Sequence, residues 1–199
     1  MSSQSNALEK YRLRLREGFC TNLFFAAKGV LGFRLLERGV HEELTVYISS
    51  PKFRRKGLLL ARDHFKSTMT VAYMIQSIAN DPTIPILDIS EIDDNAAGFV
   101  SLISQIFHSN GFFRWLFPEF DVEVFPEDSR MRFTVPRSNP GAQATIVAAG
   151  VGSSLSSQHY RLIVADDLYA ERAIRSDASR QVAIDTYKRL EPLLDPIRG

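Results

Sequence analysis

The chain has 199 residues, of which 45% are hydrophobic and 24% charged, and its formal net charge is +1. This composition fits one large soluble globular domain, and the near-neutral charge argues against a tight stand-alone DNA binder. The single cysteine excludes an intrachain disulfide and a cysteine-rich zinc site. No apolar run approaches the roughly 20 residues that span a bilayer, and the N-terminus lacks a signal-peptide hydrophobic region. We therefore expect a soluble, cytoplasmic protein with no membrane partner.

The N-terminal part of the chain is predicted to be helical. Ala7–Glu17 has the composition of a charged helix, whose arginines either contact nucleic acid or form a solvated face. Asn22–Arg38 is apolar and aromatic and is expected to pack against the core of the protein, and His41–Ser50 predicts a second helix. The basic turn that follows, Pro51–Lys56, carries four positive charges. These charges either attract phosphate groups or belong to an ordinary solvated loop.

The next stretch has the layout of a phosphate-binding loop. Leu58–Leu60 predicts a buried parallel strand, a polar turn follows, and Lys66–Thr68 opens a helix expected to run to about Ala79. In such a loop the backbone N–H groups and the helix N-terminus surround an anion, the lysine neutralises it, and the hydroxyl binds magnesium. The pattern G-x-x-x-x-G-K-[ST] has glycines where this chain has Leu60 and Phe65. A plain strand–turn–helix is therefore the alternative.

Strands and helices alternate through the middle of the chain. Ile84–Ser90 predicts a strand, and Ala96–His108 predicts a helix with acidic residues before it. Thr145–Ala149 predicts another strand rich in β-branched residues. Alternation of this kind favours a parallel sheet with right-handed crossovers. An aromatic cluster is expected after that helix, over Phe112–Phe117. A small hairpin or a loop excursion is expected next, with Val122–Phe125 and Met131–Val135 on either side of a turn.

A second motif lies near the end of the chain. Arg161–Leu168 predicts an apolar strand that ends in two adjacent carboxylates, Asp166 and Asp167. Such a strand is typical of the magnesium-coordinating partner of a phosphate loop, where one acid holds the water shell of the metal and the next orients the attacking water. The alternative is a surface turn after a core strand, with Asp167 as a helix cap. A Gly/Ser-rich loop precedes the strand, and Asp177–Leu190 predicts a final helix.

These motifs resemble a known family. Leu59–Thr68 resembles the variant Walker A motif of the large terminase subunits of tailed bacteriophages, which are DNA-packaging motor ATPases. That variant has an arginine four residues before the lysine and a histidine two before it, as Arg62 and His64 stand here. Three further stretches are similar to the same family, and the resemblance spans roughly Leu23 to Tyr169: Gly29–Phe33 with His41 downstream, Phe112–Glu119, and Gly150–Ser154 leading to the Asp-Asp Walker B strand.

The resemblance implies a fold and a function. The expected fold is that of a P-loop NTPase of the RecA/ASCE-like α/β type, with a mostly parallel central sheet flanked by helices. Residues 1–50 would be an N-terminal helical segment that packs on an ATPase core over residues 51–199. The implied function is magnesium-dependent ATP hydrolysis that powers packaging of double-stranded DNA into a procapsid, in the cytoplasm of a bacterial host. The implied partners are the small terminase subunit, the portal protein and a possible homo-oligomeric ring.

The resemblance also assigns roles to individual residues. Lys66 would contact the β- and γ-phosphates of ATP, and Ser67 and Asp166 would ligate Mg²⁺. Asp167 would be the catalytic carboxylate in place of the usual glutamate. Arg62 would stabilise the charge that develops during transfer, with an arginine from a neighbouring subunit, such as Arg172 or Arg175, as its rival. His64 is expected to be structural. The full set expected to contact the nucleotide is Ala61, Arg62, Asp63, His64, Phe65, Lys66, Ser67 and Thr68.

The end of the chain departs from the family pattern. Large terminases continue past the Asp-Asp strand into a coupling motif and a nuclease domain, whereas this sequence continues for about one helix. We therefore expect an ATPase core truncated at its C-terminus, with the nuclease domain and its activity absent. Two alternatives stay open: a helicase- or recombinase-like ATPase, and a nucleotide-binding or assembly module that does not hydrolyse ATP.

Overall fold

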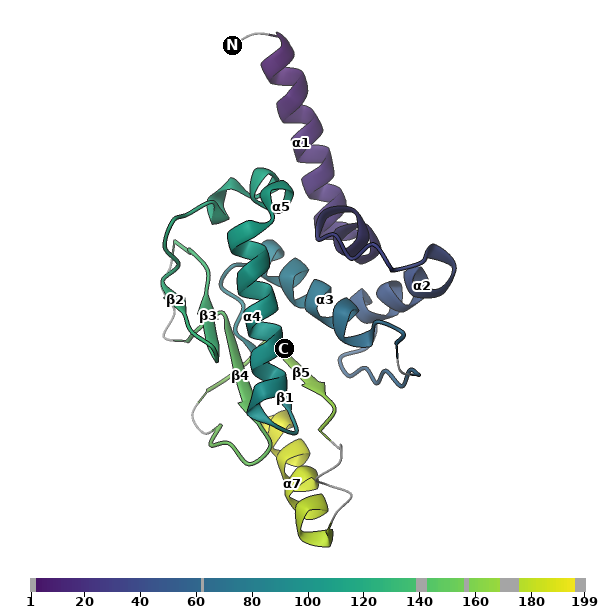
Figure 1. The fold of residues 1–199 in the computed structure, drawn as a ribbon, viewed down its shortest axis with the longest axis vertical. Helices are drawn as coiled ribbons and strands as arrows, with labels where there is room; N and C mark the ends of the chain where they lie inside the picture. The colour runs from purple at the N-terminus through teal and green to yellow at the C-terminus, as the bar shows by residue number, and fades with distance from the viewer. Residues whose placement is uncertain (1–2, 62, 139–142, 156–157, 169–175, 196–199) are drawn as a thin grey trace. The chain divides into compact units, whose positions relative to one another are not determined.

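The computed structural model describes residues 3–61, 63–138, 143–155, 158–168 and 176–195. Figure 1 shows the helices and strands of the chain with their labels. The chain divides into two compact units, each made of two stretches of sequence. The first unit contains Met1–Asn80 and Gln105–Val122, and the second contains Asp81–Ser104 and Glu123–Gly199. The units therefore cut across the expected boundary at residue 50, because the helix that begins at Lys66 belongs with the N-terminal helices.

Among the described residues, the first unit is built from helices. The helices predicted over Ala7–Glu17, over His41–Ser50 and from Lys66 onward are confirmed, each with slightly different ends. The aromatic stretch after the first helix contains a short π-helix. The elements of this unit are α1 (Ser3–Thr21), η1 (Phe25–Val30), α2 (Arg38–Ser49), α3 (Lys66–Asn80), the end of α4 (Asp93–Ser109), α5 (Gly111–Leu116) and η2 (Pro118–Phe120).

Phenylalanine rings form the core of this unit. Phe19 of α1 contacts Phe113 and Phe117, with ring centroids 5.5 Å and 5.0 Å apart, and Phe107 contacts Phe113 at 5.0 Å. All four rings are fully buried. The aromatic cluster predicted over Phe112–Phe117 therefore serves packing, which accounts for the stability of so short a helix as α5.

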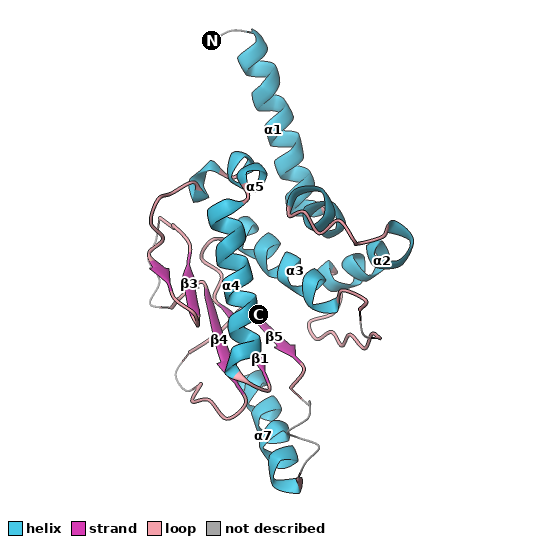
Figure 2. Cartoon of the chain, viewed as in Figure 1, coloured by secondary structure: helices cyan, strands magenta, loops and turns pink. Residues whose placement is uncertain are grey.

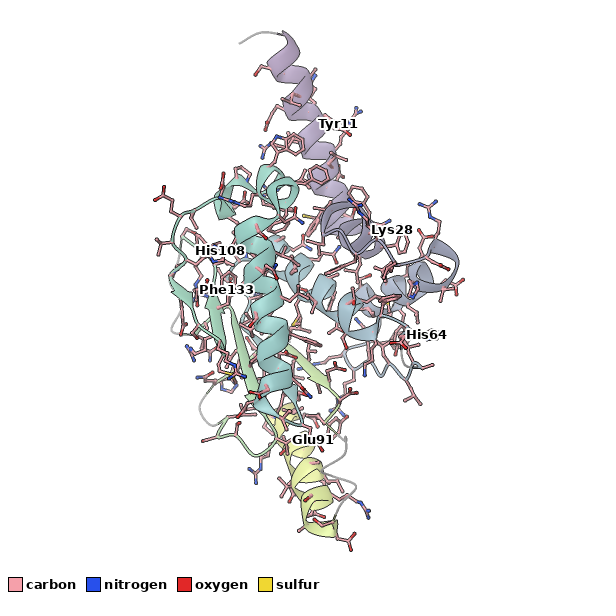
Figure 3. All side chains as sticks on the ribbon, viewed as in Figure 1. Tyr11, Lys28, His64, Glu91, His108 and Phe133 are labelled. Carbon is pink, nitrogen blue, oxygen red and sulfur yellow. The ribbon has the colours of Figure 1, made fainter. Side chains whose placement is uncertain are left out.

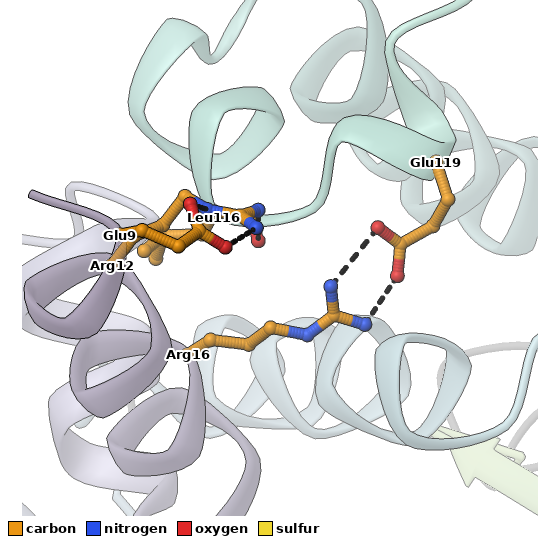
Figure 4. Close-up of polar contacts among 5 residues, drawn as sticks. All are labelled: Glu9, Arg12, Arg16, Leu116 and Glu119. Atoms are coloured by element: carbon orange, nitrogen blue, oxygen red, sulfur yellow. Dashed lines mark hydrogen bonds and ion pairs between the residues drawn. The ribbon is translucent and has the colours of Figure 1, made fainter. Parts of the chain in front are cut away.

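Two arginines of α1 hold this helix against α5 and η2 (Figure 4). Arg16 pairs with the carboxylate of Glu119 through both of its terminal nitrogens, and its guanidinium lies 4.6 Å from the centre of the Phe117 ring. Arg12 donates to the carbonyl of Leu116 at 3.3 Å and pairs with Glu9. Arg12 and Arg16 thus have intramolecular partners, which favours the structural interpretation of the charged helix over nucleic-acid contact.

The second unit contains a five-stranded sheet in the order β2-β3-β4-β1-β5 (Figure 2). The strands are β1 (Ile86–Ser90), β2 (Glu127–Asp128), β3 (Arg132–Thr134), β4 (Ile146–Gly150) and β5 (Leu162–Asp166). β1 is central and pairs in parallel with both β4 and β5, whereas β3 pairs antiparallel with β4 and β2. The sheet is therefore mixed rather than mostly parallel, because the hairpin brings β3 into it in the opposite direction.

The predicted hairpin is present, but its first arm lies later in the chain than expected. β2 is Glu127–Asp128 rather than Val122–Phe125. Phe125 instead buries its ring against that of Phe133, with centroids 4.9 Å apart. The apolar character of this segment therefore reflects side-chain packing and not a strand of the sheet.

Helix α7 (Asp177–Leu193) covers one face of the sheet. Leu87 and Ile89 of β1 pack with Leu190 of α7 and with the buried ring of Tyr160. Side chains alternate between the faces of a strand, so Ile86, Asp88 and Ser90 lie on the opposite face. Every residue of β1 is buried, and the chain is thus an α/β protein whose mixed sheet is flanked by helices.

Candidate functional site

The phosphate-loop motif forms a turn that leads into a helix, as predicted. α3 begins at Lys66, and the amide of Met69 donates to the carbonyl of Phe65 at 2.9 Å. The N–H groups of the first helical turn have no partner within a helix, and they carry the positive end of its dipole. Lys66, Ser67 and Thr68 are each partly exposed in this turn. The arrangement suits an anion at the start of α3.

Phe65 takes a conformation that side chains usually avoid. Its φ is 53°, and Asp63 two residues earlier has a φ of 67°. Left-handed backbone is costly for residues with a Cβ, and glycine is the usual solution. The position where the phosphate-loop pattern has its last glycine therefore keeps the backbone conformation that glycine favours, although a phenylalanine occupies it.

The ring of Phe65 packs against the ring of a buried histidine. His41 of α2 lies edge-on to Phe65, with ring centroids 5.6 Å apart and 64° between the planes. The orientation of His41 is fixed at its other side, where Nδ1 accepts a hydrogen bond of 2.8 Å from the backbone amide of Glu37. The beginning of α2 thereby supports the turn before α3.

The strand predicted over Leu58–Leu60 is wrong. Residues 57–61 belong to no strand or helix, and the side chain of Leu59 is 99% exposed. An apolar run becomes a strand only where a neighbouring strand completes its hydrogen bonds. These residues are instead a connection between the basic turn and α3.

The basic turn over Pro51–Lys56 is tied to the helices by one of its charges. Lys56 donates to the carbonyl of Ile48 at 2.6 Å and lies 5.6 Å from the centre of the Tyr73 ring of α3. Burial lowers the pKa of the Lys56 amine. Lys56 therefore serves to fasten the turn, and the other three basic side chains at positions 52, 54 and 55 are exposed.

The carboxylate motif lies at the end of a parallel strand, also as predicted. β5 ends at Asp166, which is paired in register with Ser90 of β1. Asp167 follows at once with a φ of 50° and is exposed. The carboxyl ends of parallel strands are the edge at which ligands of open α/β sheets bind. Asp166 and Asp167 are thus placed where a metal-bound ligand is expected.

The left-handed residues are unevenly distributed along the chain. Within the part of the chain that the structure describes, the non-glycine residues with positive φ are Asp63, Phe65 and Asp167. All three belong to the two motifs that the sequence singles out. Backbone strain of this kind costs on the order of 1–3 kcal/mol per residue and gathers at ligand-binding and catalytic positions.

The two motifs lie in different compact units, with Lys66 in the first and Asp166 in the second. Arg62, Arg172 and Arg175 lie outside the described residues. His64 is exposed in the turn before α3 (Figure 3), and Ala61 and Asp63 are exposed beside it.

One buried acid of β1 lies outside the residues that the sequence motifs single out. Asp88 is the middle residue of β1, is fully buried, and has no hydrogen-bond partner for either oxygen among the described residues. Burial raises the pKa of Asp88 to about 8, with the negative charge of Asp166 as a further cause. A carboxylate inside an otherwise apolar strand was the available signal, because Asp is rarely fully buried unless it is paired.

No protein-family model matches this sequence, and no curated protein matches it at a significant level. The fold and the site therefore define the class of protein only as an α/β protein with a five-stranded mixed sheet. Within the described residues, no helix combines the length and apolar character needed to cross a bilayer.

Proposed function

We propose that this chain is a P-loop NTPase of the RecA/ASCE type, akin to phage large terminase subunits, which hydrolyses ATP with magnesium to drive DNA packaging. The observation that carries the proposal is the left-handed backbone of Phe65 directly before Lys66 at the start of α3. A helix preceded by such a turn presents backbone N–H groups to an anion. The lysine at its first position supplies the charge that a triphosphate needs.

The residues divide the work between binding and hydrolysis. Lys66 neutralises the β- and γ-phosphates, and the hydroxyl of Ser67 and the carboxylate of Asp166 hold Mg²⁺, which shields the phosphate charge when bound. Hydroxyl and carboxylate oxygens are the donors this ion prefers. Asp167 orients the attacking water, and Arg62 stabilises the charge of the transferred group.

The physiological setting is part of the same proposal. Double-stranded DNA is the molecule that the motor moves. Its protein partners are the small terminase subunit, the portal protein and further copies of the chain. The near-neutral charge of +1 fits a motor that is held on DNA by its partners rather than by its own net charge.

Nucleotide binding and phosphate release by the purified chain test this function. We expect Lys66→Ala to abolish ATP binding measured by calorimetry, because the triphosphate loses the lysine that neutralises its β- and γ-phosphates. Asp167→Asn is expected to bind ATP and release no phosphate, since an amide cannot accept the proton of the water. Lys10→Ala, which removes an exposed lysine of α1, is the matched control and should behave as the unaltered chain.

The outcomes separate the candidate functions. Hydrolysis that survives Lys66→Ala would overturn the ATPase assignment. ATP binding without phosphate release, even with DNA and partner subunits present, would instead identify a nucleotide-dependent assembly module. Strand separation by the purified chain would indicate a helicase-like ATPase.

A further inference from the structure

The buried acid Asp88 lies on the same side of the sheet as Asp166. In the register of β1 with β5, Asp88 is opposite Val164 and Ser90 is opposite Asp166. Paired residues of parallel strands point to the same face, and residues two apart along a strand share that face. Asp88, Ser90 and Asp166 therefore lie together on the face opposite α7.

Small residues are paired with these polar groups in β4. On the other side of β1, Asp88 is paired with Ala148 and Ser90 with Gly150. A Cβ at Gly150 would lie 2.6 Å from Oδ1 of Asp93, so the carboxylate of Asp93 reaches the same face at the start of α4. Glu91 follows β1 at this edge (Figure 3). The carboxyl edge of the sheet is thus acidic, and the β4 partners of Asp88 and Ser90 are an alanine and a glycine.

A bound cation would offset the cost of burying an acid in this position. Both oxygens of Asp88 lack a hydrogen-bond partner among the described residues, and an unpaired carboxylate is costly to bury. The negative charge of Asp166 adds to this cost. A positively charged ligand between the two carboxylates would remove both penalties at once, whereas a protein built only for stability would have an apolar residue here.

We propose that Asp88 and Asp166, with the hydroxyl of Ser90 beside them, bind one divalent cation at the carboxyl edge of the sheet, and that Mg²⁺ is its natural occupant. Mg²⁺ binds to one or two carboxylates and keeps several waters. Asp166 is opposite Ser90, which is two residues after Asp88, so the two acids are offset by about 6.6 Å along the strands. A hydrated ion can bridge this offset through its bound waters.

The identity of the ion rests on the proposed function, in which Asp166 already ligates Mg²⁺. The new element is Asp88, a ligand from β1 that makes the second unit able to bind the ion without nucleotide. This property can be measured in the absence of ATP, so that the site and the ATPase function are tested separately.

Manganese serves as the probe because free Mn²⁺ is measured directly by electron paramagnetic resonance. The nucleotide-free chain is titrated with MnCl₂, and we expect one bound ion that excess Mg²⁺ displaces. Asp88→Asn and Asp88→Ser should each weaken binding by on the order of tenfold or more. Asp128→Asn, which removes an exposed carboxylate of β2 in the same unit, should leave binding unchanged.

Thermal unfolding gives an independent readout. MnCl₂ should raise the unfolding temperature of the unaltered chain more than that of Asp88→Asn, since only a ligand of the native state stabilises it.

Two results would overturn the site: an unaltered chain that binds no Mn²⁺, or Asp88 variants that bind it as tightly as the unaltered chain. Lys66→Ala distinguishes this failure from failure of the ATPase function, because it should lose ATP and retain Mn²⁺. Mn²⁺ binding that depends on Asp88 in a chain without ATP affinity would keep the site and reject the proposed function.

Discussion

The rings of His41 and Phe65 meet edge-on, with centroids 5.6 Å apart, directly before the helix that begins at Lys66. The left-handed backbone of Phe65 costs on the order of 1–2 kcal/mol, and the aromatic contact offsets part of this cost. His41 is also one of the residues on which the family resemblance is based, and it has a physical role here, because it packs against the residue directly before Lys66.

The first prediction concerns the backbone of Phe65. Phe65→Gly and Phe65→Ala both lose the ring, but only alanine retains the left-handed penalty. We expect the glycine variant to be the more stable by about 1 kcal/mol in denaturant unfolding. The same pair at Phe99, inside α4, should show the reverse order, since glycine costs about 1 kcal/mol in an ordinary helix. If the same variant, glycine or alanine, were the more stable at both positions, a left-handed conformation of Phe65 would be contradicted.

The second prediction concerns Gly150, the last residue of β4. A methyl group there would lie 2.6 Å from Oδ1 and 2.9 Å from the backbone nitrogen of Asp93. The backbone at the start of α4 cannot yield cheaply, so we expect Gly150→Ala to lower the free energy of unfolding by about 1–3 kcal/mol.

Gly98 provides the control for that substitution, because it is exposed in α4 and a Cβ there meets nothing within 4 Å. Gly98→Ala should raise the free energy of unfolding by roughly 0.5–1 kcal/mol. A Gly150→Ala variant as stable as Gly98→Ala would show that β4 and α4 are not in this close contact.

The third prediction is a pH dependence of stability due to Asp88. Burial, and then the charge of Asp166, raise the pKa of Asp88 from an ordinary 3.8 to about 8. Between these values the native state binds one more proton than the unfolded state, so the free energy of unfolding should fall as the pH rises from 4 to 8 and level off above 8. Asp93 is the other acid on this face.

The measurement is denaturant unfolding in metal-free buffer across this range, with Asp88→Asn as the comparison. The difference between the unaltered chain and the variant isolates the contribution of Asp88, because the other carboxyl groups are common to both. A difference that stays constant from pH 4 to 8 would mean that Asp88 titrates normally.

Local sequence was sufficient where a structure is determined by neighbouring residues. The start of α3 at Lys66 and the end of β5 at Asp166 follow from local patterns, and both were predicted. Leu58–Leu60 has an equally good strand pattern and forms none, because strand formation depends on a partner that the pattern does not contain.

The features that sequence analysis missed depend on residues distant in the chain. The ring of Phe65 packs against His41, which lies 24 residues earlier on α2. The isolation of Asp88 depends on the identity of its neighbours across the sheet, Ala148 and Val164, neither of which can form a hydrogen bond through its side chain. Such long-range pairings cannot be read from a single sequence without the register of the strands.

The path of the backbone also limits how this protein can be divided. The chain passes from one compact unit to the other after Asn80, again within α4 after Ser104, and once more after Val122. No single break in the chain therefore separates the two units, because a fragment that holds all of one unit also holds part of the other. A fragment that ends after Val122 would carry the loop at Lys66 with the first unit, but it would also carry β1 and the start of α4 without the strands that pair with β1.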